Sequence, residues 1–107
     1  ISKKEQALRL ADRAKDPLKQ WKISPIDQQA QKNWNGYSKC RNEMLEKTSS
    51  KDAPWIIVKA NDKKVAHIHL IQDRLSRVSY PGKDKSLLKA NKDIVFKWDG
   101  KLSKLEK

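Results

Sequence analysis

The sequence has little of what several classes of protein require. Its 107 residues include one cysteine, three glycines and one phenylalanine, and only 7% are aromatic. The single Cys40 excludes an internal disulfide and a cysteine cluster for zinc, which is typical of a reducing compartment. No apolar run approaches the roughly 18 to 20 residues of a membrane-spanning helix, and no secretory signal is visible. These absences predict a soluble, cytoplasmic protein with a modest core.

The glycines are too few and too scattered for a phosphate-binding loop. Gly36, Gly82 and Gly100 stand alone, so none belongs to the GxxxxGK[ST] pattern that cradles nucleotide phosphates. No spaced serine, histidine and acid set indicates hydrolysis. The two histidines, His67 and His69, face different sides of a helix and make a poor metal pair. We therefore expect no catalytic residue in this segment.

Acidic residues are outnumbered. Twenty-five lysines and arginines against thirteen acids leave a formal charge of +12, which favours polyanionic partners through steering and counterion release. Nucleic acid, polyphosphate, nucleotide phosphates and an anionic membrane surface all fit this sign. A well-solvated basic surface without any such partner fits it too.

The first 15 residues predict a helix. Ser2 and Glu5 form a capping-box pattern, apolar residues recur on one side, and Asp16-Pro17 ends the pattern near Lys15. Arg9 and Arg13 are four residues apart and share a helix face, where they can bind successive phosphates. The alternative is a solvated face or ion pairs with nearby acids.

The next segment places two lysines and a tryptophan before an explicit helix start. Lys19, Trp21 and Lys22 precede Ser24, Pro25 and Asp27, which are the preferred N-cap, N1 and N3 residues. Apolar residues at helical spacing then predict one long helix over 25–47, with a kink near Gly36. Two aromatic residues on this helix, Trp34 and Tyr37, are candidates for stacking on a base, although packing in the core is favoured.

A strand–turn–helix unit follows. The continuous apolar run over 55–58 predicts a strand buried on both faces, paired with parallel strands upstream of this chain or with a local strand at 94–96. Asn61 or Asp62 then caps a helix over 63–78. Ligands of open α/β sheets bind beyond the carboxyl ends of strands, where Asp62, Lys63 and Lys64 lie.

These motifs, in this order, resemble the polyphosphate kinase 2 family. The resemblance rests on the stretch over 16–27, on Ala53-Pro54-Trp55 and on the stretch over 61–64, and it weakens beyond Tyr80. It implies an α/β fold: the C-terminal part of a P-loop-kinase-like three-layer fold, mainly α-helical here with one or two short strands. The implied organisation is a helix over 1–15, a lid region over 16–50, a closing strand–helix unit over 53–80 and a tail over 81–107.

The resemblance also implies a function. The family moves phosphoryl groups between inorganic polyphosphate and nucleoside mono- or diphosphates, and this segment would supply the lid and the cations that position phosphates. The implied phosphate-binding residues are Arg9, Arg13, Lys19, Lys22, Lys63 and Lys64, supported by Asp62 and Trp21. Magnesium would be held mainly by acids upstream of this chain, the segment alone would be inactive, and the enzyme would be a homo-oligomer. Val65, Ala66 and His67 stand where the family commonly has an arginine shortly after the Asp-Lys pair, which weakens the case for His67 as a phosphate contact.

Two other classes of function stay open from the residues alone. The first is a small basic nucleic-acid-binding module that stacks bases on Trp21, Trp34, Trp55 or Trp98, although no RRM, KH, zinc-finger or bZIP signature is present. The second is a structural interaction domain whose missing strands come from another chain. Under the family resemblance, neither nucleic acid nor a membrane is an expected partner.

Overall fold

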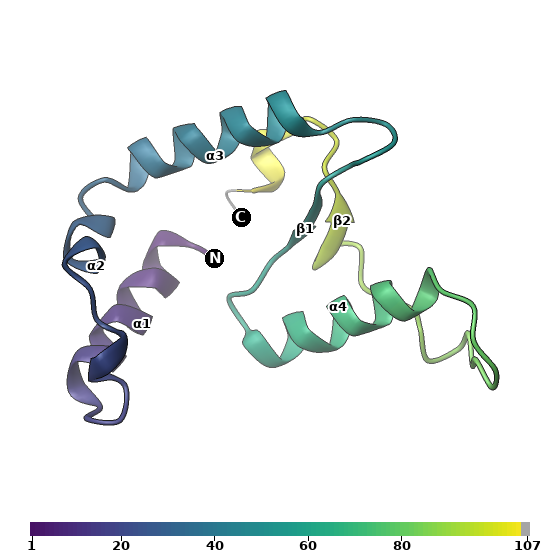
Figure 1. Cartoon of the computed structure of the whole chain (residues 1–107), viewed down its shortest axis with the longest axis horizontal. Coiled ribbons are helices and arrows are strands. Elements are labelled where there is room, and N and C mark those ends of the chain that lie inside the picture. The colour runs from purple at the N-terminus through teal and green to yellow at the C-terminus, as the bar shows by residue number, and fades with distance from the viewer. Residues whose placement is uncertain (106–107) are drawn as a thin grey trace. The chain divides into compact units, whose positions relative to one another are not determined.

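The chain is mainly helical with one small sheet (Figure 1). A computed structural model describes residues 1–105, so the last two residues of the predicted tail lie outside the described part. The elements are α1 (Lys3–Lys15), the 3₁₀ helix η1 (Gln20–Lys22), α2 (Pro25–Ala30), α3 (Trp34–Thr48), β1 (Ile56–Val58), α4 (Lys63–Ser76), β2 (Val95–Lys97) and the 3₁₀ helix η2 (Leu102–Lys104). The predicted secondary-structure content is confirmed, whereas the three-layer kinase fold stays a prediction.

The elements form two compact units. Unit 1 comprises Ile1–Thr48 together with the chain from Leu102 onward, and unit 2 comprises Ser49–Lys101. In the described part of the chain, none of the helices has the length and apolar character needed to cross a membrane.

The first helix of unit 1 has the predicted bounds. The Ser2 hydroxyl accepts a hydrogen bond from the Glu5 backbone N–H at 3.1 Å, which caps α1. Asp16 leaves helical geometry at φ −91° and ψ 112°, as expected for a residue before proline. The side-chain amide of Gln31 donates to the Lys3 carbonyl at 3.2 Å and to Gln6 Oε1 at 2.7 Å, which ties α1 to the end of α2.

The predicted single helix over 25–47 is wrong. The chain forms α2 and α3 separately, with turns at residues 31–33 and no break at Gly36. Residues 27–33 are polar apart from Ala30, so little apolar packing holds this stretch in line. The bonds that Gln31 makes to α1 instead connect the end of α2 to that helix.

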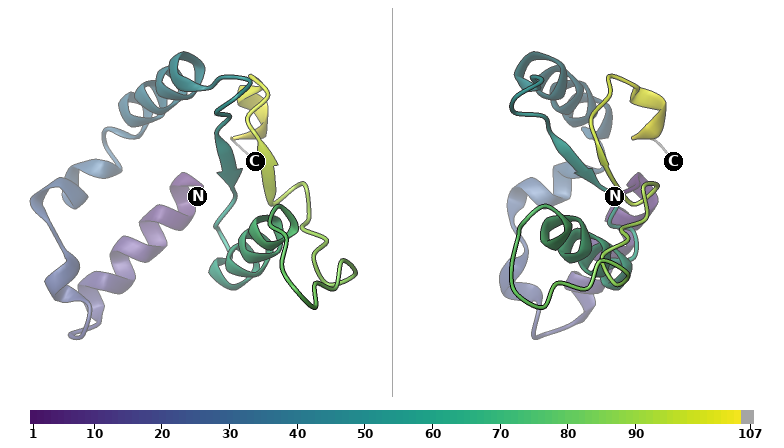
Figure 2. Two further views of the ribbon diagram at one scale, coloured as in Figure 1. Left: turned by 45° about the vertical axis from the view of Figure 1, so that its right-hand side comes forward. Right: turned by 90° about the vertical axis from the view of Figure 1, so that its right-hand side faces the viewer.

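The sheet of unit 2 is local and antiparallel. Ile56 pairs with Lys97 and Val58 with Val95, so the predicted local strand at 94–96 is the partner of β1 among the described residues. Figure 2 shows the two strands side by side. All three β1 residues are half-buried, which corrects the expectation of a strand buried on both faces. Burial of both faces requires a covering layer on each, and an apolar run alone does not provide one.

The core of unit 2 lies between α4 and β2. Ala66, Val95 and Trp98 are buried there, and Leu45 of α3 is the buried residue in the described part of unit 1. Helix α4 ends at Ser76, two residues before the predicted end, and its apolar side chains Val65, Ile68, Ile71 and Leu75 all reach solvent. The Lys83 ammonium donates to the Ser76 and Val78 carbonyls at 2.8 and 2.7 Å and so satisfies the C-terminal end of α4.

Candidate phosphate-binding site

Lys19 lies in the turn between α1 and η1, where two carboxylates surround its ammonium group. Lys19 Nζ is 2.8 Å from Asp12 Oδ2 and 2.9 Å from Asp16 Oδ2. Asp16 also accepts a hydrogen bond from the Leu18 backbone N–H at 3.0 Å. The bond from Lys19, followed by the Leu18 bond, lowers the pKa of Asp16, and the two carboxylates raise the pKa of Lys19. The two carboxylates occupy two of the three donors of this ammonium group, so a phosphate that binds Lys19 competes with them.

The two arginines of α1 are also paired. Arg9 Nε donates to Glu5 Oε1 at 2.7 Å, four residues away on the same helix. Arg13 Nη1 is 3.5 Å from Asp27 Oδ2. Thus each predicted cation of α1 already has an acidic partner within unit 1.

Asp27 has a second partner, because it completes the cap of α2. Its carboxylate accepts from the Ser24 backbone N–H at 3.1 Å, and its own N–H donates to Ser24 Oγ at 3.3 Å. This reciprocal capping box fills the start of α2. A carboxylate of the chain itself therefore lies where an incoming anion would otherwise bind.

Lys22 and Trp21 form an exposed pair. The Lys22 ammonium lies 5.1 Å from the centroid of the Trp21 ring, within the range of a cation–π contact. Trp21 is 78% exposed, and its indole N–H donates to the Leu18 carbonyl at 3.0 Å. This hydrogen bond links the ring to the preceding turn and leaves most of its surface open to solvent.

Lys63 and Lys64 occupy the first turn of α4, immediately after the connection from β1. Asp62 Oδ1 accepts from the backbone N–H groups of Lys64 and Val65 at 2.9 and 3.1 Å, so Asp62 is the N-cap of α4. Both lysines are exposed, and neither forms an ion pair with a carboxylate in the described part of the chain. Cations at the positive end of a helix oppose its dipole, and the Asp62 carboxylate at the N-cap is the acid at this helix start, because the first turn itself contains none.

The histidines have the structural roles that their spacing favours. His69 Nδ1 lies 2.8 Å from Gln72 Oε1 and accepts from the Asn91 backbone N–H at 3.3 Å, which joins α4 to the chain before β2. His67 is exposed on α4.

The tryptophans differ in what they can contact. Trp98 is 9% exposed in the core of unit 2, which removes it from the predicted stacking platforms. Trp55 is 40% exposed, and Trp34 is half-buried. Trp21 presents the largest exposed ring among these four residues.

Metal ligands are not clustered in the described residues, where no group of three His, Cys, Asp or Glu side chains is placed to hold an ion. Asp12 and Asp16 approach each other around Lys19, whose ammonium group takes the place that a metal ion would have between them. These residues do not fit a magnesium site, so we derive no step through magnesium here.

The predicted cations thus fall into two groups. Arg9, Arg13, Lys19 and Lys22 belong to unit 1, and Lys63 and Lys64 to unit 2, so each group forms its own local arrangement. The structure also identifies a cation that the sequence patterns did not. Arg41 of α3 donates from Nε and Nη2 to Asn42 Oδ1 at 3.0 and 2.8 Å, and it forms no ion pair with a described carboxylate.

The fold and these arrangements define a class: a basic, mainly helical segment with a short sheet and with lysines at a capped helix start. The family model of Polyphosphate kinase 2 matches residues 1–86. The chain belongs to the polyphosphate kinase 2 family.

Curated relatives agree with this assignment. The chain is 43% identical over 88 residues to "NDP-polyphosphate phosphotransferase 2" of Ruegeria pomeroyi, covering 82% of this chain and 26% of the relative. It is 45% identical over 80 residues to "ADP-polyphosphate phosphotransferase" of Pseudomonas aeruginosa, covering 75% and 26%. It is 39% identical over 87 residues to "GDP-polyphosphate phosphotransferase" of the same organism, covering 81% and 24%. The chain therefore spans about a quarter of the length of these relatives.

Proposed function

We propose that the full-length protein carrying this chain transfers phosphoryl groups between inorganic polyphosphate and nucleoside mono- or diphosphates. The single observation that carries the proposal is family membership over residues 1–86, with relatives whose names specify ADP, GDP or NDP and polyphosphate. The protein is then a cytoplasmic homo-oligomer of P-loop-kinase-like fold, with its magnesium held by acids outside this chain.

In this reaction the bond between the terminal phosphorus of polyphosphate and its bridging oxygen breaks, and a nucleotide phosphate oxygen forms the new bond. The transition state spreads negative charge over phosphoryl oxygens and requires little covalent work from protein groups. Positioned cations therefore supply much of the rate, and this segment contributes cations rather than a catalytic nucleophile.

The exposed lysines of α4 are the strongest candidates for that role. Lys63 and Lys64 weaken the helix start that carries them, and no acid of the described chain neutralises either one. A bound phosphate would offset the unfavourable interaction of these two lysines with the positive end of the helix dipole. Arg9, Arg13 and Lys19 are weaker candidates, because a carboxylate already neutralises part of the charge of each, while Lys22 beside Trp21 stays accessible.

The test uses the full-length protein with Lys64→Gln, and Lys63→Gln in parallel. We expect the KM for polyphosphate to rise about tenfold, since a charge-assisted phosphate contact is worth roughly 1.5 to 3 kcal/mol. Thermal stability should stay equal or rise slightly, because the helix start loses an opposing charge. Arg74→Gln is the matched control, as Arg74 is an exposed cation in the last turn of the same helix. An equal effect of the control and of Lys64→Gln would refute a positioned contact.

The nucleic-acid alternative has one supporting observation, the exposed Trp21 ring with the Lys22 ammonium over it. A stacking platform predicts that Trp21→Ala weakens single-stranded nucleic acid binding by roughly 1 to 3 kcal/mol per stacked base. Under the proposed function, inorganic polyphosphate instead displaces bound nucleic acid when the two polyanions are present at similar concentrations of negative charge. Trp21 then supports the position of Lys22.

A further inference from the structure

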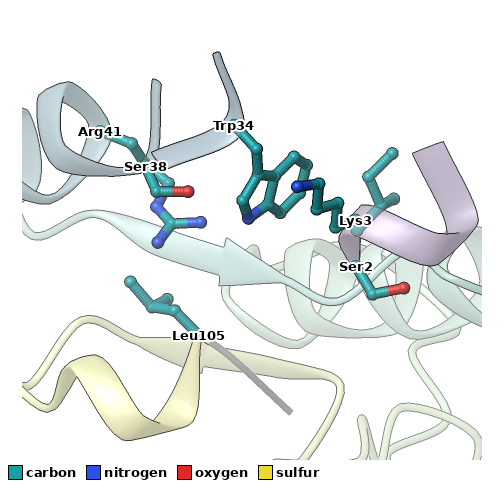
Figure 3. Close-up of a pocket in the computed structure, with 7 residues that line it drawn as sticks. Ser2, Lys3, Trp34, Ser38, Arg41 and Leu105 are labelled. Atoms are coloured by element: carbon teal, nitrogen blue, oxygen red, sulfur yellow. The ribbon is translucent and has the colours of Figure 1, made fainter. Parts of the chain in front are cut away.

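A cavity of about 240 Å³ in unit 1 is separate from the ion-paired cations discussed above. Its walls include Lys3 at the start of α1, three residues of α3 and Leu105 near the end of the described chain. The three α3 residues are Trp34, Ser38 and Arg41, which recur at helical spacing and so share one face. Figure 3 shows the Trp34 ring beside the Lys3 side chain, with the Arg41 guanidinium directed toward Leu105.

The charge of this cavity is one-sided. Neither Lys3 nor Arg41 pairs with a carboxylate in the described chain, and no acid lines the cavity. Asn42 Oδ1 holds Arg41 through its Nε and Nη2, which orients the guanidinium and leaves Nη1 available to a ligand. The hydroxyls of Ser2 and Ser38, the two serines that line the cavity, differ in availability to a ligand, because Ser2 Oγ already caps α1.

A second cavity in unit 1 provides a contrast. It has about 230 Å³ and is lined by Leu10, Ala14, Ile23, Asp27 and Gln28. Its charged group is a carboxylate, and its other walls are mainly apolar, so it disfavours a phosphate. Of these two cavities, the one at Arg41 has the chemistry for an anion.

The arrangement of the groups along α3 selects the kind of anion. Trp34 and Arg41 are seven residues apart, which is about 10 Å along a helix, with Ser38 between them. An indole ring suits an aromatic base, a hydroxyl suits a sugar and a guanidinium suits a phosphate. Inorganic polyphosphate has no ring to use the Trp34 wall. The volume is below the roughly 300 to 1,000 Å³ of drug-sized sites, which limits the ligand to about one nucleotide unit.

We propose that this cavity binds the nucleoside monophosphate unit of the nucleotide substrate, with the base on Trp34, the ribose at Ser38 and the phosphate on Arg41 and Lys3. This inference rests on the proposed function and deepens it by assigning the nucleotide, rather than polyphosphate, to unit 1. Asn42 is then a positioning residue, since it contacts Arg41 and not the ligand.

Calorimetric titration of the 107-residue chain tests the assignment with AMP, ribose 5-phosphate and inorganic tripolyphosphate. We expect AMP to bind at least about fivefold more tightly than ribose 5-phosphate, because only AMP carries a base to stack. Arg41→Gln should weaken AMP binding by about tenfold or more, and Arg41→Lys should restore part of the loss. Lys39→Gln is the matched control on the same helix, where Lys39 is exposed and outside the cavity. Its effect should stay below about twofold. Circular dichroism of each variant checks that the helices remain.

Equal affinities for AMP and ribose 5-phosphate would overturn the role of Trp34. Equal effects of Arg41→Gln and Lys39→Gln would overturn the site. In the full-length protein, an unchanged nucleotide KM in Arg41→Gln with polyphosphate-dependent transfer intact would reject the site and leave the proposed function standing. Arg41-dependent AMP binding in a protein that transfers no phosphoryl group would reject the proposed function and keep the site.

Discussion

The predicted phosphate-binding cations of unit 1 and unit 2 differ in the partners that they already have. In unit 1, Arg9, Arg13 and Lys19 are each bound to acids, and polar contacts such as those of Gln31 connect the helices. In unit 2, three buried residues form a core, while Lys63 and Lys64 remain without acidic partners among the described residues. The difference shows that net positive charge alone does not locate a phosphate site. The partners that each cation already has decide how readily it can bind an anion.

The largest expected effect concerns the core of unit 2. Trp98→Ala removes a buried ring beside β2 and should lower the free energy of unfolding by about 3 to 5 kcal/mol. Urea denaturation measures this loss. Leu87→Ala, at an exposed position of the same unit, should change it by less than about 0.5 kcal/mol. Similar losses in both variants would mean that unit 2 lacks the packed core described here.

A smaller effect is expected at the start of α4. Asp62→Ala removes the acceptor for two backbone N–H groups and should cost about 1 kcal/mol, whereas Asp62→Asn retains a capping oxygen and should cost much less. Thermal and urea unfolding compare the two variants. Asp52→Ala controls for the loss of an exposed carboxylate in the same unit. A cost for Asp62→Asn as large as that for Asp62→Ala would indicate that charge, rather than capping, stabilises this turn.

The polar contacts of unit 1 should contribute a comparable or smaller amount. Gln31→Ala removes the bonds to Lys3 and Gln6 and should destabilise the chain by roughly 0.5 to 1.5 kcal/mol. The matched control is Gln29→Ala, which makes the same chemical change at an exposed position of α2. If the two variants lose equal stability, the Gln31 bonds do not hold α1 to α2.

The smallest effect is a pH dependence in the turn at Lys19. The pKa of Asp16 is lowered in the folded chain, mainly by the hydrogen bond from Lys19, so its contribution to stability is present above the unfolded pKa near 3.8. It is lost as the pH falls through the lower, folded pKa. Asp16→Asn should therefore lessen the loss of stability upon acidification below about pH 4, and more visibly at low salt.

Denaturation midpoints measured from pH 6 down to pH 2 provide the comparison. Asp93→Asn, at an exposed position in unit 2, is the matched control. An identical acid response for Asp16→Asn and the unmodified chain would show that the contact with Lys19 does not persist in solution.

Local sequence signals predicted much of the secondary structure. The Ser2 cap and Asp16-Pro17 marked the ends of α1, and Asp62 marked the start of α4, because caps and proline act through neighbouring backbone groups. The helix over 25–47 failed for the opposite reason. At its break, Gln31 bonds to a helix about 25 residues earlier, and periodicity within the segment does not contain such a contact.

The candidate site was less predictable than the helices. Helix spacing favoured Arg9 and Arg13 for phosphate binding, and the family resemblance implied Lys19 and Lys22 as well; those roles stay predictions. The sequence left ion pairs with nearby acids open as the alternative for Arg9 and Arg13, and the Arg9–Glu5 pair has the usual i,i+4 spacing, whereas Asp27 lies outside the helix that carries its partner Arg13. No sequence pattern selected Arg41 as a ligand contact. Its place in a cavity depends on Lys3 and Leu105, which are distant from it in sequence.

By itself the sequence determined the family, the basic charge and the capped helix starts, since each depends on residue identity or on neighbours close along the chain. Only the tertiary structure decided where α2 ends and whether the strands of the sheet are parallel or antiparallel. It also decided which tryptophan is buried and which cations are paired with acids. These properties arise from contacts between residues far apart in sequence. Their energies depend on distance and burial in space, and a linear pattern contains neither.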